Sequence, residues 1–526
     1  MTTGVIKFEA KFDGINWTDI TSDVVLSAGV HIKYGITSGK MEDRVADVGT
    51  MRIALNNSIS NSGGVNGYYT PGHTNCRGGF GVDLKIRMQV TSGAVTRTKF
   101  YGTIPNDAIM PSVGQYGERR VYVTVNDWMR YPAETELGNI AYKAEQDISG
   151  VVGLIAEAMP VQPLHTDYSI GLTRFDAIYD PVAGNLRGLT ELVRAANSEF
   201  GYIYVRHDET HDEVLRVENR HSRNQIMFSD SPLYEFDNDM SGGNAEMGER
   251  YKEVTFRVYP RREDASPVVL HRLDKRISLV AGETSRFSGR YTDPSNKSSS
   301  ISARSVEAMV SGTDYIMTAN QDGTGANLTS DLDVTISTGA NTILYTLENT
   351  GSANGYVYVQ CRGIGIYGYD PVDVSLETAW PLPEPPGGWG SFVSPPAGEP
   401  RGKLSMDMRY QDDPREAHDI LNYLMPKLLW SSLVKWKSVV FYPNRNAGMM
   451  TAFLAGDVGD HVQVTEHMSG AAGKDYFVNG VEIDVLSGGI IQCKWHLMWD
   501  MPPRSAYWLL EVTGRTELGL TTVLAP

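Results

Sequence analysis

The sequence predicts a mainly β protein with a smaller α+β part, and three observations lead to that prediction. Several stretches alternate apolar and polar residues, as DLKIRMQV does at Asp83–Val90. Such alternation is typical of half-buried antiparallel strands. Three stretches have helical periodicity instead, and segments rich in glycine and proline separate the blocks.

The predicted strands share the same period of two. In the first, one face carries Leu84, Ile86, Met88 and Val90, and VYVTV at 121–125 and EVTFRV at 253–258 repeat the pattern. YVYVQCR at 356–362 alternates too, and the turn-like TGSANG joins it to TILYTLEN at 342–349. Two alternating runs joined by a short turn predict a hairpin.

Two of the helical stretches lie in the first half of the chain. One begins after Asp147, a favourable N-cap, and carries an apolar stripe of Ile148, Val151, Val152, Ile155 and Met159. The other begins at Asn185, with Leu186, Leu189, Val193 and Ala196 predicted to face inward.

The third helical stretch, DPREAHDILNYLM, has the clearest boundaries. Asp413 is the predicted N-cap, Pro414 occupies the first helical position, and Glu416 would complete a capping box. Pro426 is expected to limit the helix. The predicted buried stripe is Ala417, Ile420, Leu421 and Leu424, and all three helices are expected to cover sheets.

The sequence YVYVQCRGIGIYG contains G-x-G-x-x-G at Gly363, Gly365 and Gly368, the spacing of a dinucleotide-binding loop. That loop requires a following helix, whose N-terminus faces the pyrophosphate. Here YDPVDV follows, and Pro371 with the valines disfavours a helix. The glycines therefore predict a bend or bulge where strand pairing ends, and we expect no cofactor.

Other candidate sites are weaker. RHDETHDE, from Arg206 to Glu213, loosely resembles a zinc-binding motif, but its position favours a solvated hairpin loop over adventitious metal binding. QDGTG at 321–325 offers one carboxylate where a calcium loop needs several. His73 and Cys76 could form a Cys–His pair, although their glycine-rich surroundings make this a weak candidate. The sequence thus predicts no catalytic or metal-binding residues, and no enzyme.

Composition limits the remaining functions. The 526 residues allow about three to four domains, and the formal net charge of −16 disfavours tight binding of nucleic acid. The three cysteines are far apart and lack C-x-x-C spacing, so neither a disulfide framework nor a zinc cluster is predicted. Without a signal-peptide pattern or a long apolar run, we expect a soluble chain folded in a reducing compartment.

Several segments, in order, resemble the tail hub, or baseplate hub (minor tail protein), family of tailed bacteriophages. YYTPG, GVDLKIRMQV and TKFYGTI resemble its first domain, and the stretch from GNLRGLTELVRAANSEFGYIYV to VLRVENR resembles the next. EVTFRVYPR followed by RISLVAGETSRFSGRYTDPS resembles the family's step into an inserted sandwich, and ILYTLENTGSANGYVYVQCRGIGIYG its last hairpin. GDVGDHVQVTEHMSGAAGKDYFVNGVEIDV resembles the closing barrel.

The resemblance implies two hub-type β-barrels, a small α/β domain and an inserted immunoglobulin-like β-sandwich. The expected division is a first barrel at 1–135, an α+β domain at 136–235, a second barrel with a covering helix at 236–265 and 376–500, the sandwich at 266–375, and a C-terminal docking arm at 501–526.

The implied function is structural. Such hubs form a homotrimer at the distal end of the tail tube, so that six similar barrels join a sixfold tube to a threefold tip. Phage DNA passes through the ring without specific binding, and the implied location is the tail tip of the virion, assembled in the host cytoplasm. Expected partners are tail tube or distal tail proteins, tip or fibre proteins, and a host surface.

The sequence leaves two alternatives open. The first is a peripheral receptor- or carbohydrate-binding tail protein, and the second is a depolymerase with an unrecognised carboxylate pair. The proline- and glycine-rich segment from Trp380 to Gly402 is a candidate partner-contact loop, in which Trp389 and Phe392 are the expected contact residues, although both rings could instead fold back onto their own barrel.

Overall fold

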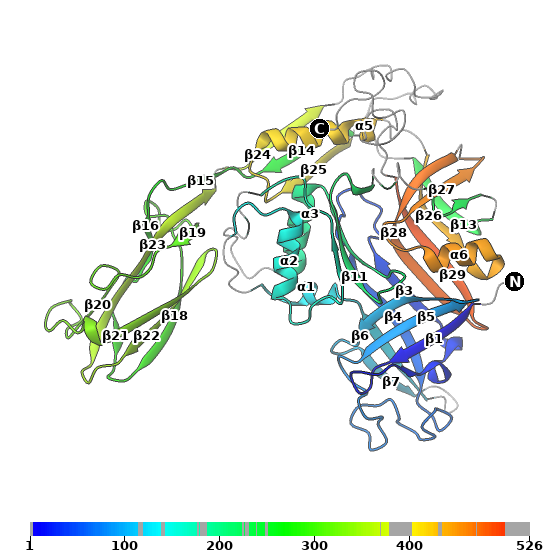
Figure 1. Ribbon diagram of the computed structural model, residues 1–526, viewed down its shortest axis with the longest axis horizontal. Coiled ribbons are helices and arrows are strands. Elements are labelled where there is room, and N and C mark those ends of the chain that lie inside the picture. The colour runs from blue at the N-terminus through cyan, green and yellow to red at the C-terminus, as the bar shows by residue number, and fades with distance from the viewer. Residues whose placement is uncertain are drawn as a thin grey trace.

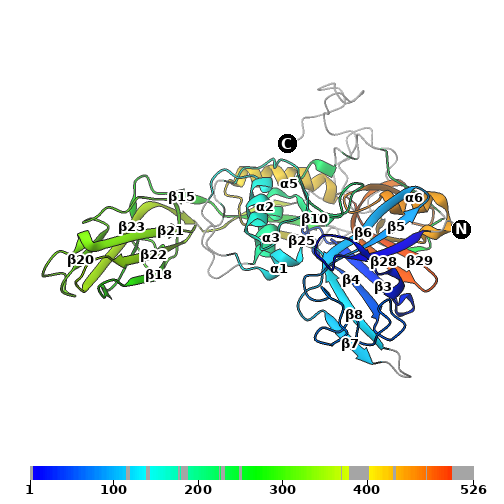
Figure 2. The same cartoon turned by 60° about the horizontal axis from the view of Figure 1, so that its bottom comes forward.

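The computed structural model describes residues 4–113, 119–137, 143–175, 178, 187–223, 226, 231–237, 239–247, 251–368, 370–377, 402–429, 434–469 and 471–499. The elements form three parts in a row, as Figures 1 and 2 show. A large sheet lies at one end, helices with small sheets occupy the centre, and a β-sandwich extends at the other end. The mainly β fold class with α+β parts is confirmed.

A 14-stranded sheet, here called the large sheet, contains strands from both ends of the chain. Its main path runs β13-β26-β29-β28-β3-β4-β8-β6-β5-β1-β2, with β7, β12 and β27 off the path. The early strands are β1 (Val5–Ala10), β2 (Thr18–Asp19), β3 (Val30–Gly35), β4 (Asp47–Asn56), β5 (Lys85–Ser92), β6 (Val95–Thr103), β7 (Ile109–Val113) and β8 (Arg119–Asn126). The late strands are β12 (Glu235–Phe236), β13 (Gly242–Met247), β26 (Val434–Phe441), β27 (His461–Glu466), β28 (Ala471–Leu486) and β29 (Ile490–Met498).

The predicted alternation decides which side of the large sheet is buried. Ile86, Met88 and Val90 have no exposed surface, and Leu84 is 5% exposed. The core beneath them is continuous from the early strands to the late ones. The helix α6 (Ala447–Ala455) lies beside this core and places Phe453 near the ammonium group of Lys99.

The central part contains α1 (Arg130–Glu134), α2 (Ile148–Ala158) and α3 (Gly188–Glu199), with a sheet of β9 (Thr166–Tyr168), β10 (Tyr202–Arg206) and β11 (Val214–Glu218). The Asp147 cap is confirmed, since its Oδ1 accepts a hydrogen bond from the Gly150 amide at 2.9 Å. The predicted start of α3 at Asn185 lies outside the described residues.

The inward stripe predicted for α3 is partly wrong, because Val193 is 38% exposed while Leu192 and Ala195 are buried. The buried face also carries Glu191 and Glu199. These carboxylates pair with arginines, namely Arg194 and Arg220 respectively. An apolar stripe alone cannot locate a face that buries paired charges.

A second small sheet consists of β14 (Tyr251–Val258), β24 (Val372–Glu377) and β25 (Gly402–Met408), and α5 (Pro414–Leu429) covers it. The predicted stripe of α5 is confirmed, since each of its members is buried: Ala417, Ile420, Leu421 and Leu424. The predicted end at Pro426 is wrong, because the helix continues to Leu429.

The predicted capping box of α5 is also wrong, although Asp413 does cap the helix. Its Oδ1 accepts a hydrogen bond from the Arg415 amide at 2.8 Å. The Asp413 amide, however, donates to Gln411 Oε1 at 3.2 Å. Glu416 instead accepts a hydrogen bond from the Thr173 hydroxyl at 3.4 Å, so a tertiary contact replaces the local one.

The sandwich consists of two sheets with a shared core. One sheet contains β15 (Arg261–Glu263), β16 (Val268–Arg272), β17 (Ile277–Leu279), β19 (Ser302–Val306), β20 (Tyr315–Thr318) and β23 (Gly355–Gly368), and the other contains β18 (Thr284–Arg290), β21 (Leu332–Thr338) and β22 (Thr342–Asn349). The predicted hairpin is wrong, because β22 and β23 belong to different sheets. The turn TGSANG therefore crosses from one sheet to the other.

The G-x-G-x-x-G glycines lie within β23, and the next element is the strand β24. The predicted end of pairing at these glycines is wrong: Gly363 pairs with Val268 on one side and Val306 on the other. A Cβ atom on Gly363 would lie 2.0 Å from the Ser305 carbonyl oxygen. The glycine thus permits close approach of a partner strand and not of a phosphate.

Strand pairing places the sandwich between Arg261 and Gly368, because β15 pairs with β23 whereas β24 pairs with β14. The division into two hub barrels, a sandwich and a docking arm stays a prediction as a whole. Within the described part of the chain, no helix is both long and apolar enough to span a membrane.

Candidate assembly surface

The two ends of the chain meet where β28 pairs with β3. This antiparallel pairing runs from Gly480↔Gly35 to Val485↔Val30. It makes one hydrogen-bonded sheet of strands that are about 450 residues apart in sequence. The surface across this junction is the candidate functional site.

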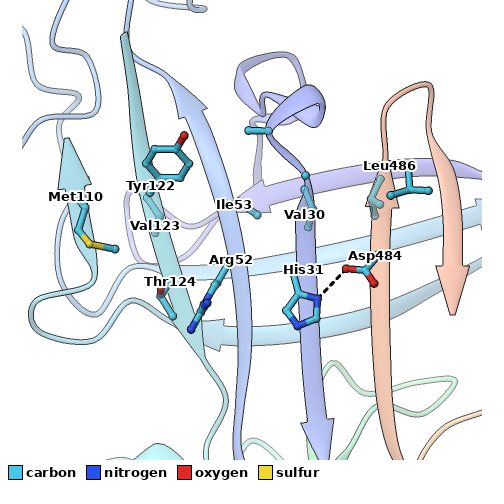
Figure 3. A pocket seen from close by; sticks show the side chains of 13 residues that line it. Val30, His31, Arg52, Ile53, Met110, Tyr122, Val123, Thr124, Asp484 and Leu486 are labelled. Atoms are coloured by element: carbon cyan, nitrogen blue, oxygen red, sulfur yellow. Dashed lines mark hydrogen bonds and ion pairs between the residues drawn. The ribbon is translucent and has the colours of Figure 1, made fainter. Parts of the chain in front are cut away.

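The side of the sheet that faces solvent at the junction, here called the outer face, carries a row of polar side chains (Figure 3). The row runs Asp484, His31, Arg52 and Thr124 on four adjacent strands. His31 Nδ1 lies 2.7 Å from Asp484 Oδ1, and these side chains are 44% and 42% exposed. An ion pair this exposed stabilises a fold by only about 0–1 kcal/mol. Because its side chains are exposed and contribute little to folding, the row is available for contacts with a partner.

A pocket of about 550 Å³ lies on the outer face, and apolar side chains accompany the charged row. Met110, Tyr122 and Leu486 line it and are 54%, 41% and 40% exposed. Exposed apolar groups beside charged ones are typical of protein contact surfaces. The outer face is therefore suited to contact another protein surface.

The hairpin loop between β10 and β11 contacts strands β5 and β6 of the large sheet. Asp212 in this loop accepts hydrogen bonds from Arg87, at 2.8 Å, and Glu209 pairs with Arg97 at the same distance. Arg87 and Arg97 belong to β5 and β6. The loop thus connects the central part to the early strands of the large sheet.

His207, at the start of this loop, meets Asp457 in the interior. The side chains are 1% and 0% exposed, with His207 Nδ1 3.2 Å from Asp457 Oδ2. The same oxygen accepts a hydrogen bond from the His207 amide at 2.9 Å. Burial alone would raise the pKa of Asp457, but His207, Lys99 and Arg206 hold it below its usual range. Asp457 is thus a buried anion close to the cationic side chains of Lys99 and Arg206.

Two further buried carboxyl groups have raised pKa values, in contrast to Asp457. Burial, and then the charge of Asp127, raises the pKa of Glu213 to about 8. Burial also raises the pKa of Asp127 to about 7, against hydrogen bonds from the amides of Gly49 and Met129. These two groups favour the protonated form in the folded protein, which makes them sensitive to pH.

The structure places RHDETHDE in the predicted hairpin loop, and the expectation that the loop is solvated holds at its tip, where Glu209 and Thr210 are exposed, but not at its two ends. His207 and Glu213 are 4% and 3% exposed, since the loop packs between the central part and the large sheet. Among the described residues, no group of histidine, cysteine and acidic side chains could hold a metal ion.

The structure does not bring His73 and Cys76 together as a Cys–His pair. His73 Nδ1 accepts a hydrogen bond from the Asn75 amide at 3.0 Å. The Cys76 thiol lies 3.7 Å from the Arg77 carbonyl oxygen, and burial raises its pKa. QDGTG is a turn, in which the Asp322 carboxylate accepts a hydrogen bond from the Thr324 amide at 2.9 Å.

The candidate contact residues Trp389 and Phe392 lie outside the described residues, as does the segment 501–526. Sequence reasoning missed the outer face, because His31 and Asp484 are brought together by strand pairing over 453 residues. It also missed Asp457, although GDVGDH has the acidic residues and glycines of a tight turn.

No protein-family model matches the chain, and no curated protein matches it significantly. Among solved structures, the chain is similar to a tail protein from Neisseria meningitidis MC58, with 9% identity, a TM-score of 0.45, and coverage of 94% of this chain and 98% of that one. It is also similar to the 43 kDa tail protein of prophage MuSo2 from Shewanella oneidensis, with 7% identity, a TM-score of 0.46, and coverage of 95% and 99%.

A third similar structure is the E. coli c3393 protein, described as a component of the type VI secretion system with structural similarity to the T4 bacteriophage tail proteins gp27 and gp5. It shares 10% identity with this chain, and the likeness covers 62% of this chain and 74% of that one at a TM-score of 0.27. All three TM-scores are below 0.5, and these likenesses assign no function to the chain.

Proposed function

We propose that this chain is a tail hub protein of a tailed bacteriophage, located at the distal end of the tail. The observation that carries the proposal is the β28–β3 junction, which joins the early and late strands in one sheet with a mixed apolar and charged outer face. The order of the sequence segments that resemble hub proteins supports the same function. In this proposal, the outer face contacts neighbouring subunits or the tail tube.

The proposed assembly is a homotrimer that joins the sixfold tube to a threefold tip. Each chain supplies two similar β units, so three chains present six. DNA passes through the ring during ejection. A net charge of −16 favours passage over adhesion, because negative charge repels phosphates.

We expect no catalytic activity. The His207–Asp457 pair resembles the His–Asp part of a catalytic triad, but both side chains are buried and Asp457 lies close to Lys99 and Arg206. Burial raises the pKa of the Cys493 thiol, which disfavours the reactive thiolate. These groups therefore fit a structural role.

A peripheral receptor- or carbohydrate-binding function is the second candidate. The sandwich extends away from the rest of the molecule in both views (Figures 1 and 2). Tyr356 and Tyr358 lie half-buried on its outer side, opposite the buried Val357 and Val359. Tyrosine rings combine an apolar face with a polar hydroxyl, as ligand-binding surfaces require.

The mass of the purified protein in solution tests the primary proposal. The hub function predicts three chains per particle, either alone or after addition of tail tubes. A particle that stays a single chain under both conditions, and binds host glycans or receptors, would favour the second function.

A further inference from the structure

One sheet of the sandwich turns two tyrosine rings toward solvent. Val357 and Val359 of β23 have no exposed surface, so Tyr356 and Tyr358 lie on the opposite side of the strand, where both are half-buried. The two tyrosines follow each other at about 6.6 Å along the strand. The surface around these two rings is here called the tyrosine face. The strand β20, which pairs with this part of β23, lies at the end of the sandwich farthest from the large sheet (Figures 1 and 2).

Hydrogen bonds hold the tyrosine face in place. The Tyr358 hydroxyl donates to Gln360 Oε1 at 2.9 Å, and Gln360 Nε2 donates in turn to the Thr313 carbonyl oxygen at 3.3 Å. On the other side of the ring, Arg276 Nη1 donates to Thr318 Oγ1 at 3.5 Å. Side chains that are already ordered lose less conformational entropy when a ligand binds. The tyrosine face is therefore organised before any ligand arrives.

Positive charge lies beside the rings. The end of β16 and the connection to β17, both of which pair with β23, carry three basic residues: Arg272, Lys275 and Arg276. The Arg276 guanidinium lies 5.8 Å from the centre of the Tyr358 ring. Asp274, the acidic residue of this connection, lies 3.7 Å from Lys297. Within the described part of the chain, no carboxylate forms an ion pair with any of the three cations. They are therefore available to an acidic ligand.

The charge of the sandwich differs from that of the whole chain. Residues 261–368 contain 10 basic and 11 acidic side chains, whereas the full chain has a formal net charge of −16. Nearly all of the excess negative charge therefore lies outside the sandwich. Since like charges repel, an acidic polymer can approach the sandwich more easily than the rest of the protein.

We propose that the tyrosine face binds an acidic oligosaccharide. The C–H bonds on one side of a sugar ring pack against the electron-rich face of a tyrosine, and two rings in a row suit successive sugars. Arg276 is placed to pair with a carboxylate on the sugar that packs on Tyr358, because guanidinium and carboxylate match in geometry. Ser278, which is in register with Tyr356, and Gln360 supply hydrogen bonds to sugar hydroxyls. The proposal rests on the carbohydrate-binding function given above as the second candidate, and a ring-forming hub can carry the same site.

Binding of defined oligosaccharides to the full chain tests the proposal. The probes are tetrasaccharides that contain galacturonate, glucuronate or sialate, each compared with its uncharged methyl ester. Wild type is expected to bind at least one acid about tenfold more tightly than the ester. Arg276→Gln should abolish that preference and leave binding of the ester unchanged. The matched control is Arg286→Gln, which changes an exposed arginine of β18 in the facing sheet and should retain the preference.

The rings are tested with the same probes. The double variant Tyr356→Ala, Tyr358→Ala should bind both acid and ester at least about tenfold more weakly. Tyr358→Phe keeps the ring and should still bind the ester, which separates loss of stacking from loss of folding. An unchanged melting temperature of the sandwich would show that each variant is folded.

Several results would overturn the proposal. Failure of wild type to bind every acidic probe would do so, as would equal binding by wild type and the double variant. Equal affinity for acid and ester would overturn the acidic ligand in favour of a neutral one. Attachment to bacterial cells that depends on the two tyrosines, without binding of any probe, would overturn it in favour of a protein partner. Assembly with tail tubes is measured separately: its absence beside intact sugar binding would contradict the hub function alone.

Discussion

The carboxylate of Asp457 accepts a hydrogen bond from the backbone amide of His207, 250 residues earlier in the chain. His207 begins the hairpin loop of the central part, and Asp457 lies just before β27 in the large sheet. Two parts of the protein therefore share a buried charged contact, and the ion pair between Arg206 and Asp460 lies beside it.

Asp457→Asn should destabilise the protein by about 3–5 kcal/mol, because it leaves buried positive groups without their anion. The folded-state pKa of Asp457 lies below its unfolded value, so its contribution is present above the unfolded pKa and is lost as pH falls through the folded value. The unfolding free energies of wild type and variant should therefore begin to converge as the pH falls below about 4, and should meet only below the folded-state pKa of Asp457.

Asp373→Asn is the matched control, since Asp373 and its partner Arg257 are 48% and 50% exposed. Its effect should stay within about 1 kcal/mol. Equal effects of the two variants would contradict the assigned role of Asp457.

Glu213→Gln should stabilise the protein at pH 8 more than at pH 5. The folded pKa of Glu213 is raised to about 8, so the unfolded chain ionises this group first as pH rises. The folded state therefore loses stability relative to the unfolded chain between about pH 4 and pH 8. The uncharged glutamine side chain of the variant removes that loss. The gain at pH 8 is expected on the order of 2–4 kcal/mol.

Thermal unfolding at the two pH values measures this difference. Glu209→Gln is the control from the same loop, because the Glu209 side chain is 73% exposed and should show no such pH-dependent gain. A gain for Glu213→Gln that is independent of pH would show that Glu213 is ionised in the fold.

The double variant Met110→Ser, Tyr122→Ser should weaken assembly without unfolding the subunit. The two residues are 54% and 41% exposed on the outer face, so their loss removes only part of a buried contact. The unfolding free energy should fall by about 1–3 kcal/mol, which leaves the subunit folded. Sedimentation should show more single chains than for Ile170→Ser, which changes a 77% exposed residue elsewhere. Equal assembly of the two variants would place the contact on another surface.

Replacing the sandwich by a glycine-serine linker should leave a soluble protein that still assembles. Cuts after Pro260 and before Tyr369 keep β24 paired with β14, whereas cuts at 266 and 375 would remove most of β24. The sandwich has its own core, as an inserted domain requires. A shortened protein that stays monomeric, or melts far below wild type, would make the sandwich part of the ring.

The sequence was most informative where local pattern decides structure. The alternation in β5 and the Asp147 cap depend on neighbours within a few residues, and both predictions are confirmed. Predictions from the sequence were wrong where tertiary contacts replace local ones. Glu416 bonds to Thr173 instead of closing its capping box, and β22 and β23 separate into facing sheets.

The candidate site was harder to predict than the fold. The outer face depends on the register between β28 and β3, which places Asp484 beside His31. No local pattern contains that information, because each strand alone shows only alternation. The contacts of the hairpin loop were missed for a related reason: its charges are paired by residues from β5 and β6, which the loop sequence does not reveal.

Electron microscopy of the purified protein mixed with tail tubes tests the central claim most directly. The account predicts a threefold ring at one end of the tube, with an open centre and the sandwiches on the outside. Particles bound along the side of the tube, or tubes whose ends stay bare, would contradict the hub function.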